Sequence, residues 1–482
     1  MLTATMLLIP TACSSDPGVT VSSSQTDTVD TGSVESSGSA DTAPVTATDD
    51  PQPEPNDEPA TVDEPIGPYE PEPIEWSELD DNTDVATLDV PVDYDDPTGD
   101  RFELFLARHR ALDPDARIGS LLVNPGGPGF GGSEYARSAP FIFDRVLLER
   151  FDIVAWDPRG TGRSEPAIDC IDDYDTFFNT GDGTPETDEE HQVVIGIAAT
   201  FAEECERNNA TIFEHVGTNN SARDIDSIRR ALGEDTISYF GLSYGSELGG
   251  AWVTLFPDTV RAAVFDGASD PNADAVESSV QQHAGFESSL ESFLARCSAD
   301  DGCRFHNDGD ARTAFVALME ALDADPLEVD PDRPPVNRDT ALLATSQAMY
   351  SEAYWPALER ALADAADGDG TGLLALFDAY YRRRPDGTYG NELEAFQVIS
   401  CADRSERPTV EEADADVPRF HEVAPLFVPD GSIGGYFCTF FSPAIDPLIV
   451  EGCRSSPRWV AIADAKRACT SARLDLGMTR LA

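Results

Sequence analysis

The residues best suited to chemistry surround Ser243. An apolar stretch, 237–242, runs into the pattern Gly-x-Ser-x-Gly, in which Gly241 and Gly245 flank the serine. A β-prone run followed by this pattern and a helix-prone stretch predicts a nucleophile elbow, a sharp turn between strand and helix. The glycines are needed because the strained turn leaves no room for Cβ atoms beside the serine. The turn would expose the Ser243 hydroxyl and place the N–H of Tyr244 at a helix N-terminus, where it can bind an oxyanion.

A glycine-rich segment, 124–132, supports this interpretation. It follows the apolar stretch 119–123, which predicts a buried strand. A glycine-rich loop after a strand can also hold phosphate, but this one lacks the Lys-Ser/Thr of a P-loop and the dinucleotide-binding spacing. Beside a nucleophile elbow, such a loop supplies the second oxyanion N–H. We assign that role to Gly127, with Gly126 as the near alternative.

The base and acid of a catalytic triad are not recognisable. In hydrolases with this elbow, an Asp or Glu and then a His follow the serine. Three of the six histidines follow Ser243, and His283 and His306 fall in a helical segment. The third, His421, lies upstream of the expected acid, so an Asp403–His421 pair is disfavoured.

The last 32 residues, 451–482, differ in character from the rest. They hold six basic and three acidic residues in a chain whose net charge is −58, and two further cysteines, Cys453 and Cys469. One hypothesis is that a frameshift or truncation near residue 450 replaced the segment that carries the acid and the histidine. The alternative is a divergent tail, with the base supplied in another way.

The elements that must position these residues alternate along the chain. Strands are predicted at the segments 87–94, 101–108, 119–123, 151–155, 237–242 and 260–265. A helix is predicted over 221–232, with Gly233 as its stop. Strands alternating with helices predict a parallel sheet covered on both faces. From about 272 to 400 helical patterns replace the strands, as in a lid over an active site. In the turn 156–164, Asp157 and Arg159 are expected to brace loops rather than do chemistry.

The acidity of the chain limits its partners. A net charge of −58 argues against nucleic acid and against electrostatic binding to anionic lipid. Residues 1–12 resemble the end of a lipoprotein signal, which would make Cys13 a lipidated residue and confine membrane contact to that anchor. The acidic, Pro/Ser/Thr-rich residues 13–75 are predicted to be a disordered stalk. The true start codon is then expected upstream of Met1.

Six of the nine cysteines fall in three couples close in sequence, which suggests disulfides in an exported protein. Among the fifteen possible pairings we favour Cys170–Cys205, Cys297–Cys303 and Cys401–Cys438. No cysteine or histidine cluster has zinc spacing, and no cofactor is expected.

Together these motifs resemble the secreted tripeptidyl aminopeptidases, α/β-hydrolases related to the proline iminopeptidases. The similar segments occur in the family's order, and they are 124–129, 156–164, 231–233, 241–250, 256–271 and 401–403 together with Cys438. The resemblance implies an α/β-hydrolase fold, Ser243 as nucleophile, Tyr244 and Gly127 as oxyanion donors, and a helical lid that recognises a free peptide N-terminus.

The resemblance also gives a domain plan and a function. The plan has the core at 76–271, the lid at 272–400, the start of the family's C-terminal region at 401–450 and an anomalous tail at 451–482. The function expected is that of an exported, monomeric serine aminopeptidase acting on peptides. The alternatives are an esterase or lipase of the same fold, and a surface-anchored peptide-binding homologue without catalysis.

Overall fold

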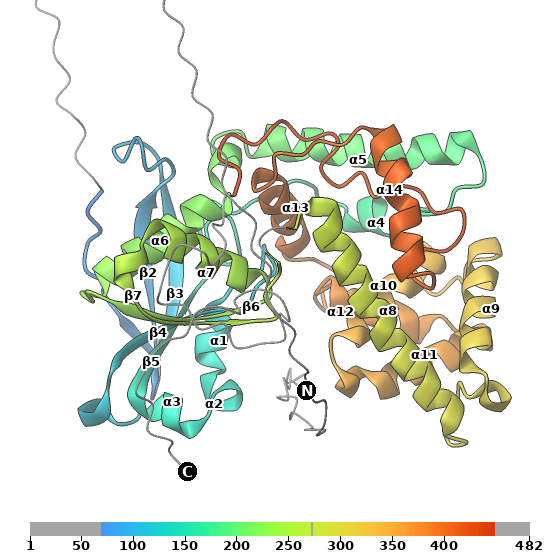
Figure 1. Cartoon of the computed structure of the whole chain (residues 1–482), viewed down its shortest axis with the longest axis horizontal. Coiled ribbons are helices and arrows are strands. Elements are labelled where there is room, and N and C mark those ends of the chain that lie inside the picture. The colour runs from blue at the N-terminus through green and yellow to red at the C-terminus, as the bar shows by residue number, and fades with distance from the viewer. Residues whose placement is uncertain (1–68, 271–272, 449–482) are drawn as a thin grey trace, which may run out of the picture. The chain divides into compact units, whose positions relative to one another are not determined.

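The computed structural model describes residues 69–270 and 273–448 (Figure 1). The predicted signal segment, the lipidation of Cys13, most of the predicted stalk and the tail 451–482 lie outside the described residues. No helix in the described part of the chain is long and apolar enough to cross a membrane.

A seven-stranded mixed sheet forms the core, in the order β1-β2-β3-β5-β4-β6-β7. Strands β1 to β3 are antiparallel, β3 also pairs antiparallel with β5, and β5, β4, β6 and β7 are mutually parallel. The strands are β1 Ser77–Asp80, β2 Thr83–Pro91, β3 Arg101–His109, β4 Gly119–Asn124, β5 Phe151–Trp156, β6 Ile237–Leu242 and β7 Val260–Asp266. The predicted strands are therefore present, and β1 adds an edge strand that sequence patterning did not identify.

Helices cover both faces of the sheet. Residues of α6 (Thr218–Ala231) and α7 (Tyr244–Leu255) pack against one face. Helix α5 (Asp188–Asn208) adds Phe201, Ala202 and Cys205 to the same hydrophobic core. The short helices α1 (Ser133–Arg137), α2 (Ala139–Ile142) and α3 (Arg145–Arg150) cover the other face. Strand β4 is buried along its whole length because it lies in the parallel centre of this sandwich. Its apolar sequence is the pattern that such a position requires.

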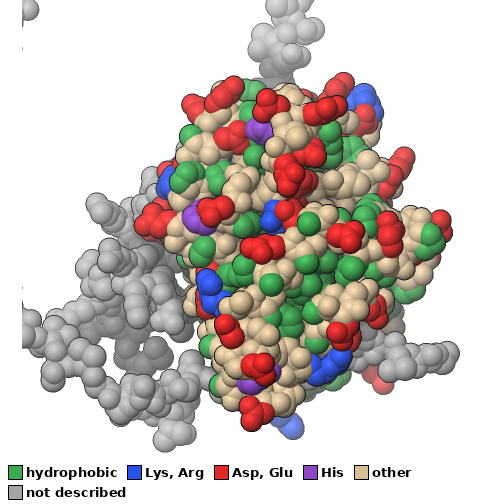
Figure 2. Space-filling model, turned by 90° about the vertical axis from the view of Figure 1, so that its right-hand side faces the viewer, with side chains coloured by type: hydrophobic (Ala, Val, Ile, Leu, Met, Phe, Trp, Pro, Cys, Tyr) green, Lys and Arg blue, Asp and Glu red, His purple; other side chains and the backbone are tan. Residues whose placement is uncertain are grey.

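A helical segment follows β7 and has a hydrophobic core of its own. In the described residues it contains no strand, only an isolated bridge between Leu327 and Val336. That core is formed by α8 Ala275–Ala299, α9 Ala311–Ala324, α10 Arg338–Met349, α11 Trp355–Ala366 and α12 Thr371–Tyr380. Helix α13 Glu392–Ala402, whose buried apolar residues belong to the core of the sheet, and helix α14 Val410–Val423 follow them. The helical run thus continues past residue 400, the boundary expected from sequence, and α14 packs against α8. Figure 2 shows a surface rich in acidic side chains, with apolar side chains between them.

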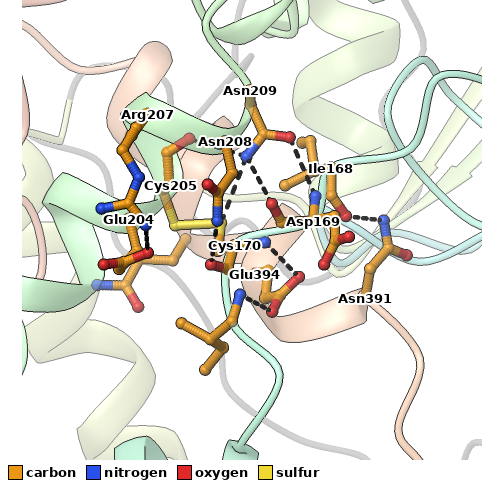
Figure 3. The surroundings of a disulfide bond; sticks show 12 residues. Ile168, Asp169, Cys170, Glu204, Cys205, Arg207, Asn208, Asn209, Asn391 and Glu394 are labelled. Carbon is orange, nitrogen blue, oxygen red and sulfur yellow. Dashed lines mark hydrogen bonds and ion pairs between the residues drawn. A yellow bond between two sulfur atoms is a disulfide. The ribbon is translucent and has the colours of Figure 1, made fainter.

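In the described part of the chain, three disulfides join Cys170 to Cys205, Cys297 to Cys303 and Cys401 to Cys438, the pairing favoured from sequence. The first of them anchors α5 to the segment that follows β5. Helix α13 is bound to that same segment (Figure 3). The Glu394 carboxylate accepts hydrogen bonds from the backbone N–H of Cys170 at 3.1 Å and of Ile171 at 3.0 Å. The Asn391 amide donates to the carbonyl oxygens of Gly160 and Ile168.

The buried Glu394 carboxylate predicts a pH dependence of stability. Burial raises the pKa of Glu394 from 4.5 to about 7. Between these values the folded protein holds a proton that the unfolded chain has released, so stability falls as the pH rises. The full effect is on the order of 3 kcal/mol. We expect the unfolding free energy of Glu394→Gln, measured by urea titration, to decrease less between pH 5 and 7.5 than that of the wild type. Parallel curves for the variant and the wild type would contradict this.

Candidate active site

Ser243 lies between strand β6 and helix α7, as the Gly-x-Ser-x-Gly pattern predicts. Its backbone has φ 52° and ψ −125°, a conformation that non-glycine residues rarely adopt. The turn is held on both sides. The Ser243 N–H donates to the carbonyl of Asp266 at 2.8 Å, and the Ser243 carbonyl accepts from the N–H of Ser246 at 2.8 Å. Strained backbone of this kind is typical of functional positions.

The two glycines of the pattern are fixed by close contacts. A Cβ on Gly241 would lie 2.2 Å from the carbonyl oxygen of Gly245. A Cβ on Gly245 would lie 2.5 Å from the carbonyl oxygen of Asn124, at the end of β4. The elbow is therefore packed directly against the start of the glycine-rich loop, with backbone on both sides of the contact.

The same loop distinguishes the two candidates for the second oxyanion donor. Gly126 lies against the elbow, since a Cβ there would be 3.2 Å from the Tyr244 nitrogen. However, the Gly126 N–H already donates to the Asn124 side-chain oxygen at 2.9 Å. Among the described residues, the N–H groups of Gly127 and Tyr244 have no acceptor. Of the two candidates, Gly127 is therefore the one whose N–H is free, which favours it over Gly126.

No histidine of the chain is bound to the elbow. All six lie in the described residues, and none of their side-chain hydrogen bonds, ion pairs or ring contacts involves Ser243 or Tyr244. The contacts made instead are His109 with Asn82, His191 with Tyr436 and Asp414, His283 with Ser279 and Phe420, His306 with Gly309 and Asp301, and His421 with Val428 and Asp430. His215 contributes its backbone carbonyl to Arg159.

The disfavoured Asp403–His421 pair is not formed. The Asp403 carboxylate accepts from the Thr218 N–H and hydroxyl, both at 2.6 Å, whereas the Nδ1 atom of His421 lies 2.8 Å from the Val428 carbonyl. Sequence patterning gave no role to Thr218, whose hydroxyl also contacts the Tyr244 hydroxyl. The available signal was the position of Asp403 in a Cys-Ala-Asp segment that resembles the family. No group of metal-ligating side chains was found in the described residues.

Comparison with known proteins identifies the family. The model of the alpha/beta hydrolase fold matches residues 119–342. Serine protease Hip1 of Mycobacterium tuberculosis is 36% identical over 406 residues, which cover 77% of this chain and 75% of Hip1. The chain belongs to the α/β-hydrolase family of Hip1. Carboxylesterase B of the same species is 35% identical to this α/β-hydrolase over 354 residues, 71% of this chain and 66% of that protein.

The tripeptidyl aminopeptidase of Streptomyces coelicolor is 34% identical to this α/β-hydrolase over 233 residues, 46% of this chain and 42% of that protein. These relatives bear out the family resemblance drawn from sequence. Solved structures overlap less closely. Juvenile hormone epoxide hydrolase from the silkworm Bombyx mori is 12% identical with a TM-score of 0.26, covering 63% of this chain and 58% of that chain.

Proposed function

We propose that this α/β-hydrolase is an exported serine aminopeptidase that releases short peptides from free N-termini. Ser243 attacks the scissile carbonyl, the peptide C–N bond breaks, and the rest of the peptide leaves as an amine that takes up the serine proton. Water then hydrolyses the acyl-enzyme and releases the short N-terminal peptide. The N–H groups of Tyr244 and Gly127 stabilise the oxyanion of each tetrahedral intermediate. The observation that carries the proposal is the strained Ser243 at the start of α7, beside a glycine loop with an unused N–H.

The relatives and the disulfides support the finer parts of the proposal. A serine protease and a tripeptidyl aminopeptidase are among the relatives, which favours peptides as substrates. Three disulfides fit an oxidising compartment, and therefore export. A lipid on Cys13 would then hold the enzyme at the cell surface.

Catalysis by the 482-residue chain is expected to be slow. A serine hydrolase needs a base to take the serine proton, and none of the six histidines of the chain contacts Ser243. An oxyanion hole and a serine without their base retain only about 10³–10⁴-fold catalysis over water. This feature keeps a second candidate open, a peptide-binding homologue that does not turn over its ligand.

The test compares three substrates with the purified chain and with Ser243→Ala. They are a tripeptide p-nitroanilide with a free N-terminus, its N-acetylated form and a p-nitrophenyl ester. We expect slow release of p-nitroaniline from the free form, less from the acetylated form, and none above background with Ser243→Ala. Preference for the ester would support an esterase, the activity named in the relative carboxylesterase B. Equal release by Ser243→Ala would reject Ser243 as nucleophile.

A further inference from the structure

A chain of three buried side chains connects the elbow to the end of helix α13. The Tyr244 hydroxyl contacts the Thr218 hydroxyl, which in turn donates to the Asp403 carboxylate at 2.6 Å. The second carboxylate oxygen accepts from the Thr218 N–H, also at 2.6 Å. Thr218 is the first residue of α6, Tyr244 the first of α7, and Asp403 directly follows α13. One carboxylate thus holds the starting turns of both helices that cover this face of the sheet.

The number of protons fixes the direction of the chain. An ionised carboxylate can only accept hydrogen bonds, so the Thr218 hydroxyl must use its single proton to donate to Asp403. The Thr218 oxygen must then accept from the Tyr244 hydroxyl. Burial raises the pKa of Tyr244 well above its usual value, so the phenol keeps its proton. The ionised state of Asp403 therefore permits one arrangement, from Tyr244 through Thr218 to Asp403.

Asp403 also serves helix α6 as a cap. The residue before this helix is Gly217, which has no side chain to accept the first N–H groups. The Asp403 carboxylate, 185 positions further along the chain, accepts the Thr218 N–H instead. Its own position is fixed, since its carbonyl accepts from the Leu448 N–H at 2.8 Å and Cys401 nearby is joined to Cys438. The carboxylate is thus held by groups that do not depend on the elbow.

We propose that Asp403 is a positioning residue for the oxyanion donor at Tyr244, acting through the Thr218 hydroxyl. The Tyr244 side chain is anchored at its far end, which fixes the direction of the Tyr244 backbone N–H beside Ser243. The inference rests on the proposed function, because the N–H has this role only if Ser243 is the nucleophile.

The variant Asp403→Asn tests the direction of the chain while keeping the shape of the side chain. In this variant the amide oxygen still accepts from the Thr218 N–H, and the amide NH2 replaces the oxygen that accepted from the Thr218 hydroxyl. The amide then donates to that hydroxyl, which donates to Tyr244 and leaves the phenol proton without its acceptor. Tyr244→Phe removes the same contact from the other end. Asp310→Asn is the matched control, because Asp310 accepts from the Thr313 N–H at the start of α9, in the helical segment.

The first readout is the second-order rate of fluorophosphonate labelling of Ser243. Removing an oxyanion donor outright costs about 10²–10³-fold, so for a displaced donor we expect about a tenfold loss in Asp403→Asn and Tyr244→Phe. The double variant should lose little more, because both changes break one chain. Asp310→Asn should label like the wild type. If the wild-type protein labels and both single variants label at the same rate, the proposal is overturned.

The second readout is the pH profile, which a purely structural role would not move. Burial raises the pKa of Asp403 to about 7, with the Thr218 hydrogen bonds and Arg404 opposing the shift and Glu247 adding to it. Protonation reverses the chain, so wild-type labelling should fall as the pH drops through about 7. In Asp403→Asn this step should be absent. A step of the same size in the variant would reject the role of Asp403.

A third readout keeps the inference testable if the proposed function fails. If the wild-type protein does not label at all, the proposed function fails, but the anchoring of Tyr244 can still be measured. Amide hydrogen exchange of the peptide covering 243–248 should be faster in Asp403→Asn and Tyr244→Phe than in the wild type and Asp310→Asn. Equal exchange in all four would overturn the proposal.

Discussion

Gly245→Ala is expected to lower fluorophosphonate labelling of Ser243 by at least about a hundredfold, since a displacement of about 1 Å at a reacting group has costs of this size. The added Cβ would meet the Asn124 carbonyl oxygen at 2.5 Å and its side-chain oxygen at 2.9 Å. The first of these is backbone at the end of a buried strand and cannot turn away. Helix α7 must therefore shift, and Ser243 and the Tyr244 N–H shift with its first turn.

The control is Gly285→Ala in helix α8. Gly285 is also helical, but a Cβ there meets no atom within 4 Å. Since alanine is favoured over glycine inside a helix, this variant should be neutral or more stable by about 0.5–1 kcal/mol, with labelling unchanged. If Gly245→Ala labels as fast as Gly285→Ala, the elbow tolerates movement and the packing argument fails.

Asp224→Ala is expected to reduce the free energy of unfolding by about 3–5 kcal/mol, because it leaves a buried guanidinium without its counter-charge. Arg159 and Asp224 have fully buried side chains and form two hydrogen bonds, at 2.6 and 2.8 Å. The Arg159 guanidinium also donates to the carbonyls of Pro91, Val92 and His215. The pair thus joins the end of β2, the turn after β5 and helix α6.

A solvent-exposed ion pair provides the comparison. Arg296 and Glu352 lie 3.4 Å apart with side chains 69% and 70% exposed. Glu352→Ala should change the free energy of unfolding by less than about 1 kcal/mol. Urea titrations of both variants at one pH measure the two effects. Similar losses in the two proteins would show that burial does not decide the value of the Arg159–Asp224 pair.

Much of the fold and the elbow could be predicted because their signals are local. The strand before Ser243, the glycines beside it and the helix after it are consecutive in sequence, and steric contacts require each of them. The bracing role expected for Arg159 was also visible as a charged residue in a tight turn between core elements. The three disulfides join cysteines that are near one another in the chain.

The rest depends on contacts between distant residues, which patterning does not reveal. Thr218 and Asp403 are 185 positions apart, and neither lies in a motif with known chemistry. The choice of Gly127 over Gly126 needed the Asn124 hydrogen bond, which depends on a side-chain rotamer rather than on spacing. The continuation of the helical run through α14 reflects packing against α8, and α14 itself has a proline at position 418 that weakens its sequence signal.

The cap that Asp403 gives to helix α6 has a consequence for biosynthesis. A ribosome makes Thr218, Ser243 and Tyr244 well before it reaches residue 403. Until then the first N–H of α6 lacks its acceptor and the Tyr244 hydroxyl has no carboxylate at the end of its chain. About 160 further residues must therefore be synthesised after Ser243 before Asp403, the anchor of the elbow, exists. On the proposed role of Asp403, Ser243 of a partly made chain should therefore be acylated more slowly than Ser243 of the finished protein, in which helix α13 has been made and docked.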